Sequence, residues 1–154
     1  MRPKRDVKWA ESAKFGIPIK LTDKVYIVAF KCPMKKEFDP YYQPFERLSC
    51  SEVKDHYKSQ HKMHLSSVFD LANTNKYYDR KDWGPNVDYF KYKSQGQTTP
   101  SKNWLTGITR TIYRQVEIAE ELDQISVIGV HCTHGINRTG YVISSFLKIF
   151  NSQI

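Results

Sequence analysis

The sequence predicts an α/β fold in which helices flank a central, mainly parallel, twisted sheet. Short runs of β-branched and aromatic residues alternate with longer stretches of helical periodicity, an order that is typical of strands joined by helical crossovers. The chain has 154 residues, of which 40% are hydrophobic and 14% aromatic, so it can bury a substantial core. We therefore expect residues 1–154 to form a single domain.

The first third of the chain is predicted to contain one strand and the start of a helix. Residues 1–24 are basic and irregular, and we expect them to wrap around the body of the domain. Val25 to Phe30 combines β-branched and aromatic residues, as strands do. Residues 33–48 contain three prolines, which predict a loop rather than a helix. Ser49 to Glu52 resembles a capping box, so a helix is expected to follow.

Two further strands and a long helix are predicted downstream. Leu65 to Leu71 is predicted to form a strand that ends at Asp70. Val87 to Tyr92 alternates apolar and polar residues, which indicates a half-buried strand. From Leu105 to Leu122, apolar residues recur at three- and four-residue steps, which predicts an amphipathic helix. In such folds, ligands bind at the carboxyl ends of the strands.

A short polar loop, His131 to Gly140, follows a buried strand at Val127 to Val130 and precedes an apolar helix that reaches about Phe150. A loop of this kind wraps its backbone N–H groups around an anion, and the helix N-terminus adds positive potential. The same field favours the thiolate form of a cysteine such as Cys132. Arg138 offers two parallel N–H donors to phosphoryl oxygens. The pattern predicts a cysteine nucleophile that faces a bound phosphoryl group.

We expect the backbone N–H groups of the loop to bind the phosphate. The hydroxyl of Thr139 is expected to donate a hydrogen bond to the sulfur of the cysteine or to cap the following helix. His131 is expected to orient the loop through hydrogen bonds to the backbone. The alternative, an inert core thiol, leaves Arg138 at the start of an apolar helix without an anionic partner. The residues expected to bind the phosphate are Thr133, His134, Gly135, Ile136, Asn137 and Arg138.

The composition favours polyanionic partners. The chain has 24 Lys and Arg against 16 Asp and Glu, a formal net charge of +8, which suits nucleic acid, although a solvated basic surface explains the same excess. No apolar run approaches the length of a membrane span, so we expect no membrane association. Three cysteines without a disulfide pattern fit a reducing, intracellular compartment.

The histidines raise the alternative of a metal site. Structural zinc sites use paired ligands at regular spacing, and no second pair of cysteines is present. We therefore expect neither a metal nor a cofactor. The candidate ligands fall into two groups, with His131, Cys132 and His134 in the loop and His56, His61 and His64 upstream.

Three ordered motifs carry a resemblance to a known superfamily. The form Cys-x5-Arg-Thr-Gly of residues 132–140 matches the protein-tyrosine-phosphatase superfamily. The full sequence of residues 131–141 (HCTHGINRTGY) is more specific than this general form. Together with residues 70–79 (DLANTNKYYD) and residues 30–33 (FKCP) downstream of Trp9, it resembles the cysteine-dependent RNA 5′-triphosphatases. This branch includes the metazoan capping-enzyme domain, RNA-associated dual-specificity phosphatases and the baculovirus phosphatase.

The resemblance implies a cysteine-phosphatase fold over about residues 9–150, with two departures. Members usually continue for several tens of residues beyond the last helix found here, whereas this chain ends at Ile154, so we expect the usual C-terminal helices to be missing. Tyrosine phosphatases also supply an aspartic acid upstream of the cysteine, and Gly96 to Pro100 here has no carboxylate. Because a diphosphate departs without a proton donor, the missing acid favours phosphoanhydride substrates.

The resulting expectation is a polynucleotide 5′-phosphatase that removes the terminal phosphate of 5′-triphosphate RNA through a cysteinyl-phosphate, without a metal. The expected catalytic residues are Cys132, Arg138, Thr139 and Asp70. Asp70 is placed by family analogy, and its alternative role is to cap a turn with its own backbone. Lys76 is expected to contact the outer phosphates, and a solvated position explains it equally well.

Two other functions stay open at this point. One is a dual-specificity phosphatase that acts on phosphoproteins, and the other is an inactive RNA-binding protein. We expect RNA 5′-triphosphate ends to be the main partner, and the protein to be a monomer. By analogy with the family, we expect the protein to be located in the nucleus or cytoplasm. Whether it is a cellular or a viral protein stays open.

Overall fold

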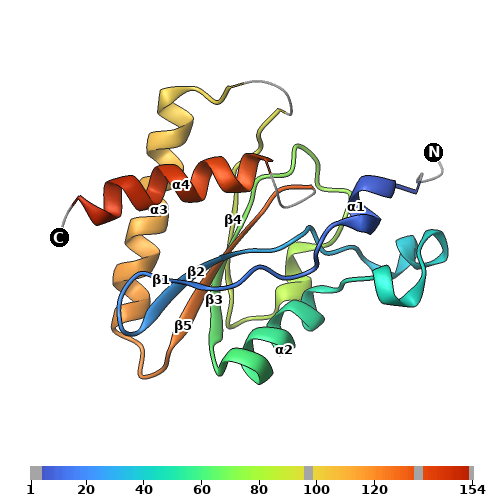
Figure 1. Cartoon of the computed structure of the whole chain (residues 1–154), viewed down its shortest axis with the longest axis horizontal. Coiled ribbons are helices and arrows are strands. Elements are labelled where there is room, and N and C mark those ends of the chain that lie inside the picture. Colours follow the sequence, from blue (N-terminus) through green and yellow to red (C-terminus); the bar gives the residue numbers. More distant parts are fainter. Residues whose placement is uncertain (1–4, 96–98, 134–136, 153–154) are drawn as a thin grey trace.

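A computed structural model describes residues 5–95, 99–133 and 137–152 of the chain. Within these ranges, a five-stranded sheet has the strand order β1-β2-β5-β3-β4 (Figure 1). Among these strands only β1 runs antiparallel to its neighbour, so the predicted α/β fold with a mainly parallel sheet is confirmed. The strands are β1 (Ile19–Lys20), β2 (Val25–Ala29), β3 (His64–Asp70), β4 (Asp88–Lys91) and β5 (Ser126–His131).

The three predicted helices are present in the predicted order, and the described residues also form one short α-helix and three 3-10 helices that were not predicted. The capping box is present, since the Ser49 hydroxyl accepts the backbone N–H of Glu52 at 3.1 Å and starts the second helix. None of the helices in the described part of the chain is both long and apolar enough to cross a membrane. The α-helices are α1 (Val7–Glu11), α2 (Cys50–His61), α3 (Lys102–Glu120) and α4 (Asn137–Asn151), and the 3-10 helices are η1 (Lys36–Tyr41), η2 (Pro44–Glu46) and η3 (Arg80–Trp83).

Two predictions about irregular segments are corrected by the structure. The described part of residues 1–24 is not irregular throughout, because it contains α1 and β1. Residues 33–48 form the helical turns η1 and η2 rather than a plain loop. A proline at the start of a helical turn loses no hydrogen bond, so Pro44 opens η2, and 3-10 turns are short enough to tolerate nearby prolines.

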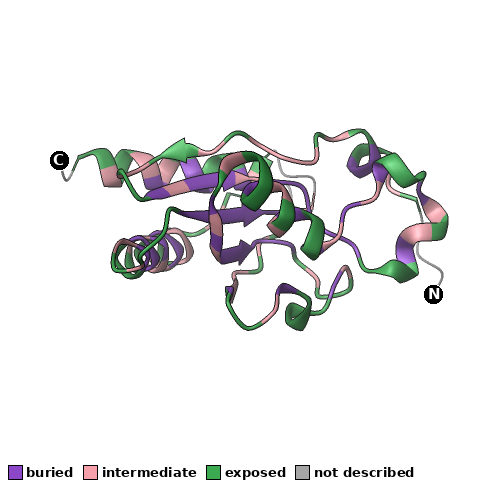
Figure 2. Cartoon of the chain, turned by 90° about the horizontal axis from the view of Figure 1, so that it is seen from below, coloured by how far each residue is buried: buried purple, intermediate pink, exposed green. Residues whose placement is uncertain are grey.

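The two faces of the sheet have different cores. Helices α3 and α4 cover one face, where the buried side chains are mainly aliphatic. Helix α2 and the segments around the 3-10 helices cover the other face, where large aromatic side chains such as Trp9, Tyr57 and Trp83 are buried. Figure 2 shows the buried central strands between helices whose outer surfaces are exposed. The aromatic core reaches the N-terminal helix α1, which is thereby joined to the body of the domain.

The carboxyl ends of the parallel strands meet at one edge of the sheet. Strands β2 and β5 are in register as far as Val130. Asp70, the last residue of β3, pairs with His131 of β5 on one side and with Lys91 of β4 on the other. The segments that follow these strands therefore lie together, and Figure 1 shows α1 beside them. This is the edge at which α/β folds bind ligands.

Candidate active site

Cys132, the predicted nucleophile, directly follows β5 and lines a cavity of about 420 Å³. The residue is 9% exposed, so it is held by the core and still reaches the cavity. Thr133 and the first two residues of α4, Asn137 and Arg138, line the same cavity. The structure thus brings these four predicted residues together. The predictions for His134, Gly135 and Ile136 lie outside the described residues.

Arg138 reaches the cavity from the first turn of α4. Its Nη2 donates a hydrogen bond to the backbone oxygen of Gln95. The side chain also borders a smaller groove of about 190 Å³, which Lys93 and Trp104 help to line. An anion in the cavity beside Cys132 would therefore meet a guanidinium and the N-terminus of a 15-residue helix.

Other segments complete the cavity wall. Ligands of such folds bind at the carboxyl ends of parallel strands, so Asn73 after β3 and Ser94 after β4 could have been predicted from this rule. No sequence signal points to Lys8, which lies more than 120 residues before Cys132. The wall residues that the sequence analysis did not assign to the site are Asp6, Lys8, Leu71, Ala72, Asn73, Tyr77 and Ser94.

His131 supports the loop that carries Cys132. Its Nδ1 donates to the backbone oxygen of Cys132 at 3.2 Å, because a carbonyl can only accept. Its Nε2 then accepts the hydroxyl hydrogen of Tyr78 at 2.8 Å. Burial lowers the pKa of His131, although Asp70 acts in the opposite direction, so the ring is neutral. These contacts include the hydrogen bond that the sequence analysis expected from this histidine to the loop backbone.

Asp70 is buried and is not among the residues that line the cavity. Its Oδ1 accepts the backbone N–H of Ala72 at 3.0 Å, which is the turn-capping role given above as the alternative. Its Oδ2 accepts the Tyr89 hydroxyl at 2.6 Å and lies 3.1 Å from the Lys91 ammonium. Burial alone would raise the pKa of this carboxyl, but the charge of His131 when protonated, the Tyr89 hydroxyl, the Lys91 ammonium and the Ala72 N–H together bring the pKa below its usual value. The contacts describe a positioning group, and a catalytic role of Asp70 stays a prediction.

Thr139 is fully buried in the first turn of α4. Its hydroxyl has no hydrogen-bond partner among the residues that the structure describes, which is rare for a buried polar group. The expected donation from Thr139 to the sulfur of Cys132 is therefore not seen in this part of the chain. It stays a prediction for the thiolate form.

Lys76 is exposed and does not line the cavity. Its ammonium lies 5.3 Å from the ring centre of Tyr77, which does line the cavity. Contact of Lys76 with outer phosphates stays a prediction. Within the described ranges, no three His, Cys, Asp or Glu side chains gather in a way that could hold a metal ion.

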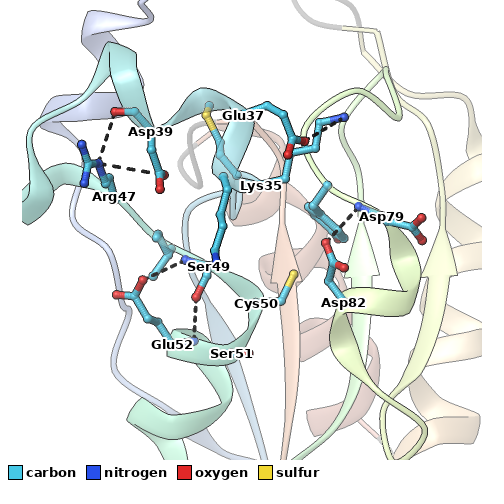
Figure 3. Close-up of a pocket in the computed structure, with 14 residues that line it drawn as sticks. Lys35, Glu37, Asp39, Arg47, Ser49, Cys50, Ser51, Glu52, Asp79 and Asp82 are labelled. Atoms are coloured by element: carbon cyan, nitrogen blue, oxygen red, sulfur yellow. Dashed lines mark hydrogen bonds and ion pairs between the residues drawn. The ribbon is translucent and has the colours of Figure 1, made fainter.

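A second cavity, of about 650 Å³, lies at the N-terminus of α2 (Figure 3). Cys50 is among its lining residues, but burial, with a smaller contribution from Asp82, raises the pKa of this thiol well above its usual value. Such a cysteine stays protonated, and the five carboxylates that line the cavity outnumber its three cations, Lys35, Lys36 and Arg47, so the charge there does not favour phosphate. The cavity around Cys132 therefore remains the candidate active site. The carboxylates of the second cavity are Glu37, Asp39, Glu52, Asp79 and Asp82.

Comparison with known proteins places the chain among phosphatases. It is 34% identical over 127 residues to a Bos taurus RNA/RNP complex-1-interacting phosphatase, covering 78% of this chain and 35% of that protein. It is 35% identical over 122 residues to a Mus musculus mRNA-capping enzyme, covering 75% of this chain and 19% of that protein. It is 30% identical over 143 residues to a tyrosine-protein phosphatase of Autographa californica nuclear polyhedrosis virus, covering 91% of this chain and 77% of that protein.

The chain thus spans about a third of the length of the RNA/RNP complex-1-interacting phosphatases and most of the viral protein. No family model matches it. The fold is shared with a Leishmania major chain described as a protein tyrosine phosphatase (14% identical, TM-score 0.61, covering 90% of this chain and 81% of that one). It is also shared with Tk-PTP in its active form (17% identical, TM-score 0.58, covering 86% and 72%). The chain belongs to the protein-tyrosine and dual-specificity phosphatase superfamily, in the branch that contains the RNA/RNP complex-1-interacting phosphatases, the mRNA-capping enzyme and the baculovirus phosphatase.

Proposed function

We propose that this phosphatase is a polynucleotide 5′-phosphatase that removes the terminal phosphate of 5′-triphosphate RNA. The observation that carries the proposal is the cavity that Cys132 and Arg138 share at the N-terminus of α4. Two of the relatives are named for RNA, as an RNA/RNP complex-1-interacting phosphatase and as an mRNA-capping enzyme. The formal net charge of +8 suits a polyanionic substrate.

The proposed reaction consists of two displacements at phosphorus. The thiolate of Cys132 attacks the terminal phosphorus, the bond from this phosphorus to the bridging oxygen breaks, and diphosphate-ended RNA leaves with the electron pair. Water then attacks the cysteinyl-phosphate, losing a proton to solvent, and the sulfur recovers its electron pair as phosphate departs. Arg138 holds two equatorial oxygens and stabilises the charge that develops on them. Because the guanidinium and backbone N–H groups supply positive charge, this route uses no metal.

The leaving group decides which substrates fit. Residues 96–100 contain no carboxylate, and Asp6 is the one carboxylate among the described residues that line the cavity. Its Oδ1 already accepts the Trp9 N–H at 3.0 Å as the cap of α1. A diphosphate departs as an anion near neutral pH, whereas a serine alkoxide needs a proton. A site without a dedicated acid therefore favours phosphoanhydrides.

A dual-specificity phosphatase is the second candidate function. It is favoured by the position of Asp6 in the cavity wall, and by the name of the viral relative, a tyrosine-protein phosphatase. In this alternative, the carboxyl of Asp6 would protonate the departing oxygen of a phosphoprotein substrate.

One assay separates these functions. The protein is incubated in EDTA with γ-labelled triphosphate RNA and, in parallel, with a phosphotyrosine peptide, and both incubations are repeated with the Cys132→Ser variant. We expect phosphate release from the RNA without a metal, and a loss of at least about 10³-fold in the variant, because serine is a poor nucleophile without an adjacent base. More efficient turnover of the peptide would favour the second candidate. Tight RNA binding without turnover of either substrate would favour an RNA-binding protein.

A further inference from the structure

The N-terminal segment brings a lysine into the wall of the catalytic cavity. Lys8 lies in α1 and lines the same cavity as Cys132 and Arg138. Of the described residues in this wall, Lys8 and Arg138 are the two cations. In the proposed mechanism, Arg138 binds the phosphoryl group that is transferred. Lys8 has no part in that mechanism, so its position needs a separate explanation.

The residue next to Lys8 is fixed in the core of the domain. Trp9 is fully buried, and its indole Nε1 donates to the backbone oxygen of Cys32 at 2.7 Å. The buried ammonium of Lys31 donates to the backbone oxygen of Trp9 at 3.1 Å and lies 3.8 Å from the centre of its ring. The burial and contacts of Trp9 therefore fix the backbone of the adjacent residue Lys8.

The start of α1 is fixed as well. Arg5 forms a two-bond ion pair with Glu46, at 2.9 and 2.8 Å. The backbone N–H of Asp6 donates to the Tyr42 hydroxyl at 2.9 Å. Anchors thus lie on both sides of Lys8, although α1 itself has only five residues. Such fixation reduces the entropy that the backbone around Lys8 loses when this residue binds a ligand.

The ammonium of Lys8 forms no ion pair with a carboxylate among the described residues, and the residue is exposed. An unpaired cation on a fixed support beside a phosphate-binding loop is suited to a second phosphate. A phosphomonoester has no second phosphate, whereas a triphosphate end has two further phosphates that carry additional negative charge. The charge and position of Lys8 therefore match a polyphosphate chain.

We propose that Lys8 binds the β- or α-phosphate of a 5′-polyphosphate while Cys132 and Arg138 engage the terminal phosphate. Lys8 is then a specificity-determining residue, which distinguishes phosphoanhydrides from phosphomonoesters. The inference rests on the proposed function and adds to it the part of the site that holds the leaving group. Charge neutralisation there also stabilises the departing diphosphate, so Lys8 contributes to binding and to leaving-group departure.

The kinetic test compares Lys8→Met with a matched control. Lys36→Met removes the same charge from an exposed lysine that lines the other cavity. We expect Lys8→Met to lower kcat/KM for triphosphate RNA about tenfold, the effect of losing one charged contact. Hydrolysis of p-nitrophenyl phosphate, whose leaving group needs no acid and which has no further phosphate, is expected to change less than about twofold. Lys36→Met should leave both reactions unchanged.

A binding measurement keeps this inference separate from the proposed function. Calorimetry with the Cys132→Ser protein gives the Kd of inorganic tripolyphosphate and of orthophosphate, with and without Lys8→Met. We expect the Kd of tripolyphosphate to rise about tenfold and that of orthophosphate to stay the same.

Equal losses for both ligands, or no loss for either, would overturn the role of Lys8. Failure of the unmodified protein to hydrolyse triphosphate RNA would instead overturn the proposed function, and the binding result would still decide the role of Lys8. Thermal unfolding of each variant shows whether the fold is intact.

Discussion

Two cysteines follow neighbouring parallel strands at the same edge of the sheet, and their surroundings differ. Cys132 follows β5 and faces a cavity that it shares with Arg138. Cys32 follows β2, is fully buried, and donates its thiol hydrogen to the backbone oxygen of Pro33 at 3.3 Å. Burial, with a further contribution from Asp70, raises the pKa of Cys32 well above its usual value. One thiol can act as a nucleophile, and the other remains a core residue.

The difference comes from the segment after each cysteine and from the residues that support it. After Cys132 the chain enters α4, which supplies Arg138 and a helix N-terminus. After Cys32 it enters Pro33 and the 3-10 turns, which supply neither. Cys132 is also supported by a buried polar network through His131, whereas Cys32 belongs to the aromatic core. The position of a cysteine at the end of a strand is therefore not enough to make it reactive.

Removing the guanidinium should make the surroundings of Cys132 more like those of Cys32. We expect Arg138→Lys to lower kcat/KM for triphosphate RNA by at least about 10²-fold, because an ammonium cannot hold two equatorial oxygens in parallel. Steady-state kinetics measures the effect, with Arg110→Lys on the exposed surface of α3 as the control. Activity of Arg138→Lys within about tenfold of the unmodified protein would contradict the assigned role.

The elements around Cys132 could be predicted because local signals define them. The buried strand β5, the loop and the apolar helix α4 follow one another without interruption, and their residue types are those that predict an anion-binding loop. The capping box at Ser49 likewise identified the start of α2. Each of these signals lies within a few residues of the feature it predicts.

The contacts between distant segments could not be predicted from the same sequence. The ion pair between Asp70 and Lys91 depends on the register of β3 and β4, which no local pattern specifies. The approach of Lys8 to the cavity depends on the burial of Trp9 against segments that are distant in the sequence. The 3-10 turns of residues 33–48 were missed because prolines argue against an α-helix without excluding shorter turns.

The polar network under Cys132 can be tested through stability. Asp70→Asn removes the negative charge next to the largely buried ammonium of Lys91, and we expect it to lower the free energy of unfolding by about 2 kcal/mol at pH 7. The pKa of Asp70 is lower in the folded than in the unfolded state, where it is about 3.9. The contribution of Asp70 to the free energy of unfolding is therefore fully present above the unfolded-state pKa, and it is lost as the pH falls through the folded-state pKa. Urea unfolding from pH 7 to pH 3 should therefore show a difference between the two proteins that narrows below about pH 4. A difference that stays constant or widens on acidification would contradict the network.

Alkylation tests the comparison of the two cysteines directly. We expect iodoacetamide at pH 7 to modify Cys132 at least about tenfold faster than Cys32 or Cys50, since only a thiolate that reagents can reach reacts quickly. The pKa of each of the other two thiols is raised by burial, so both stay protonated until the protein unfolds. Mass spectrometry of the peptides over time measures the three rates. In urea the rates should converge, and orthophosphate should slow only Cys132 in the folded protein. Labelling of Cys32 in the folded protein at a rate close to that of Cys132 would show that the two strand ends are chemically alike.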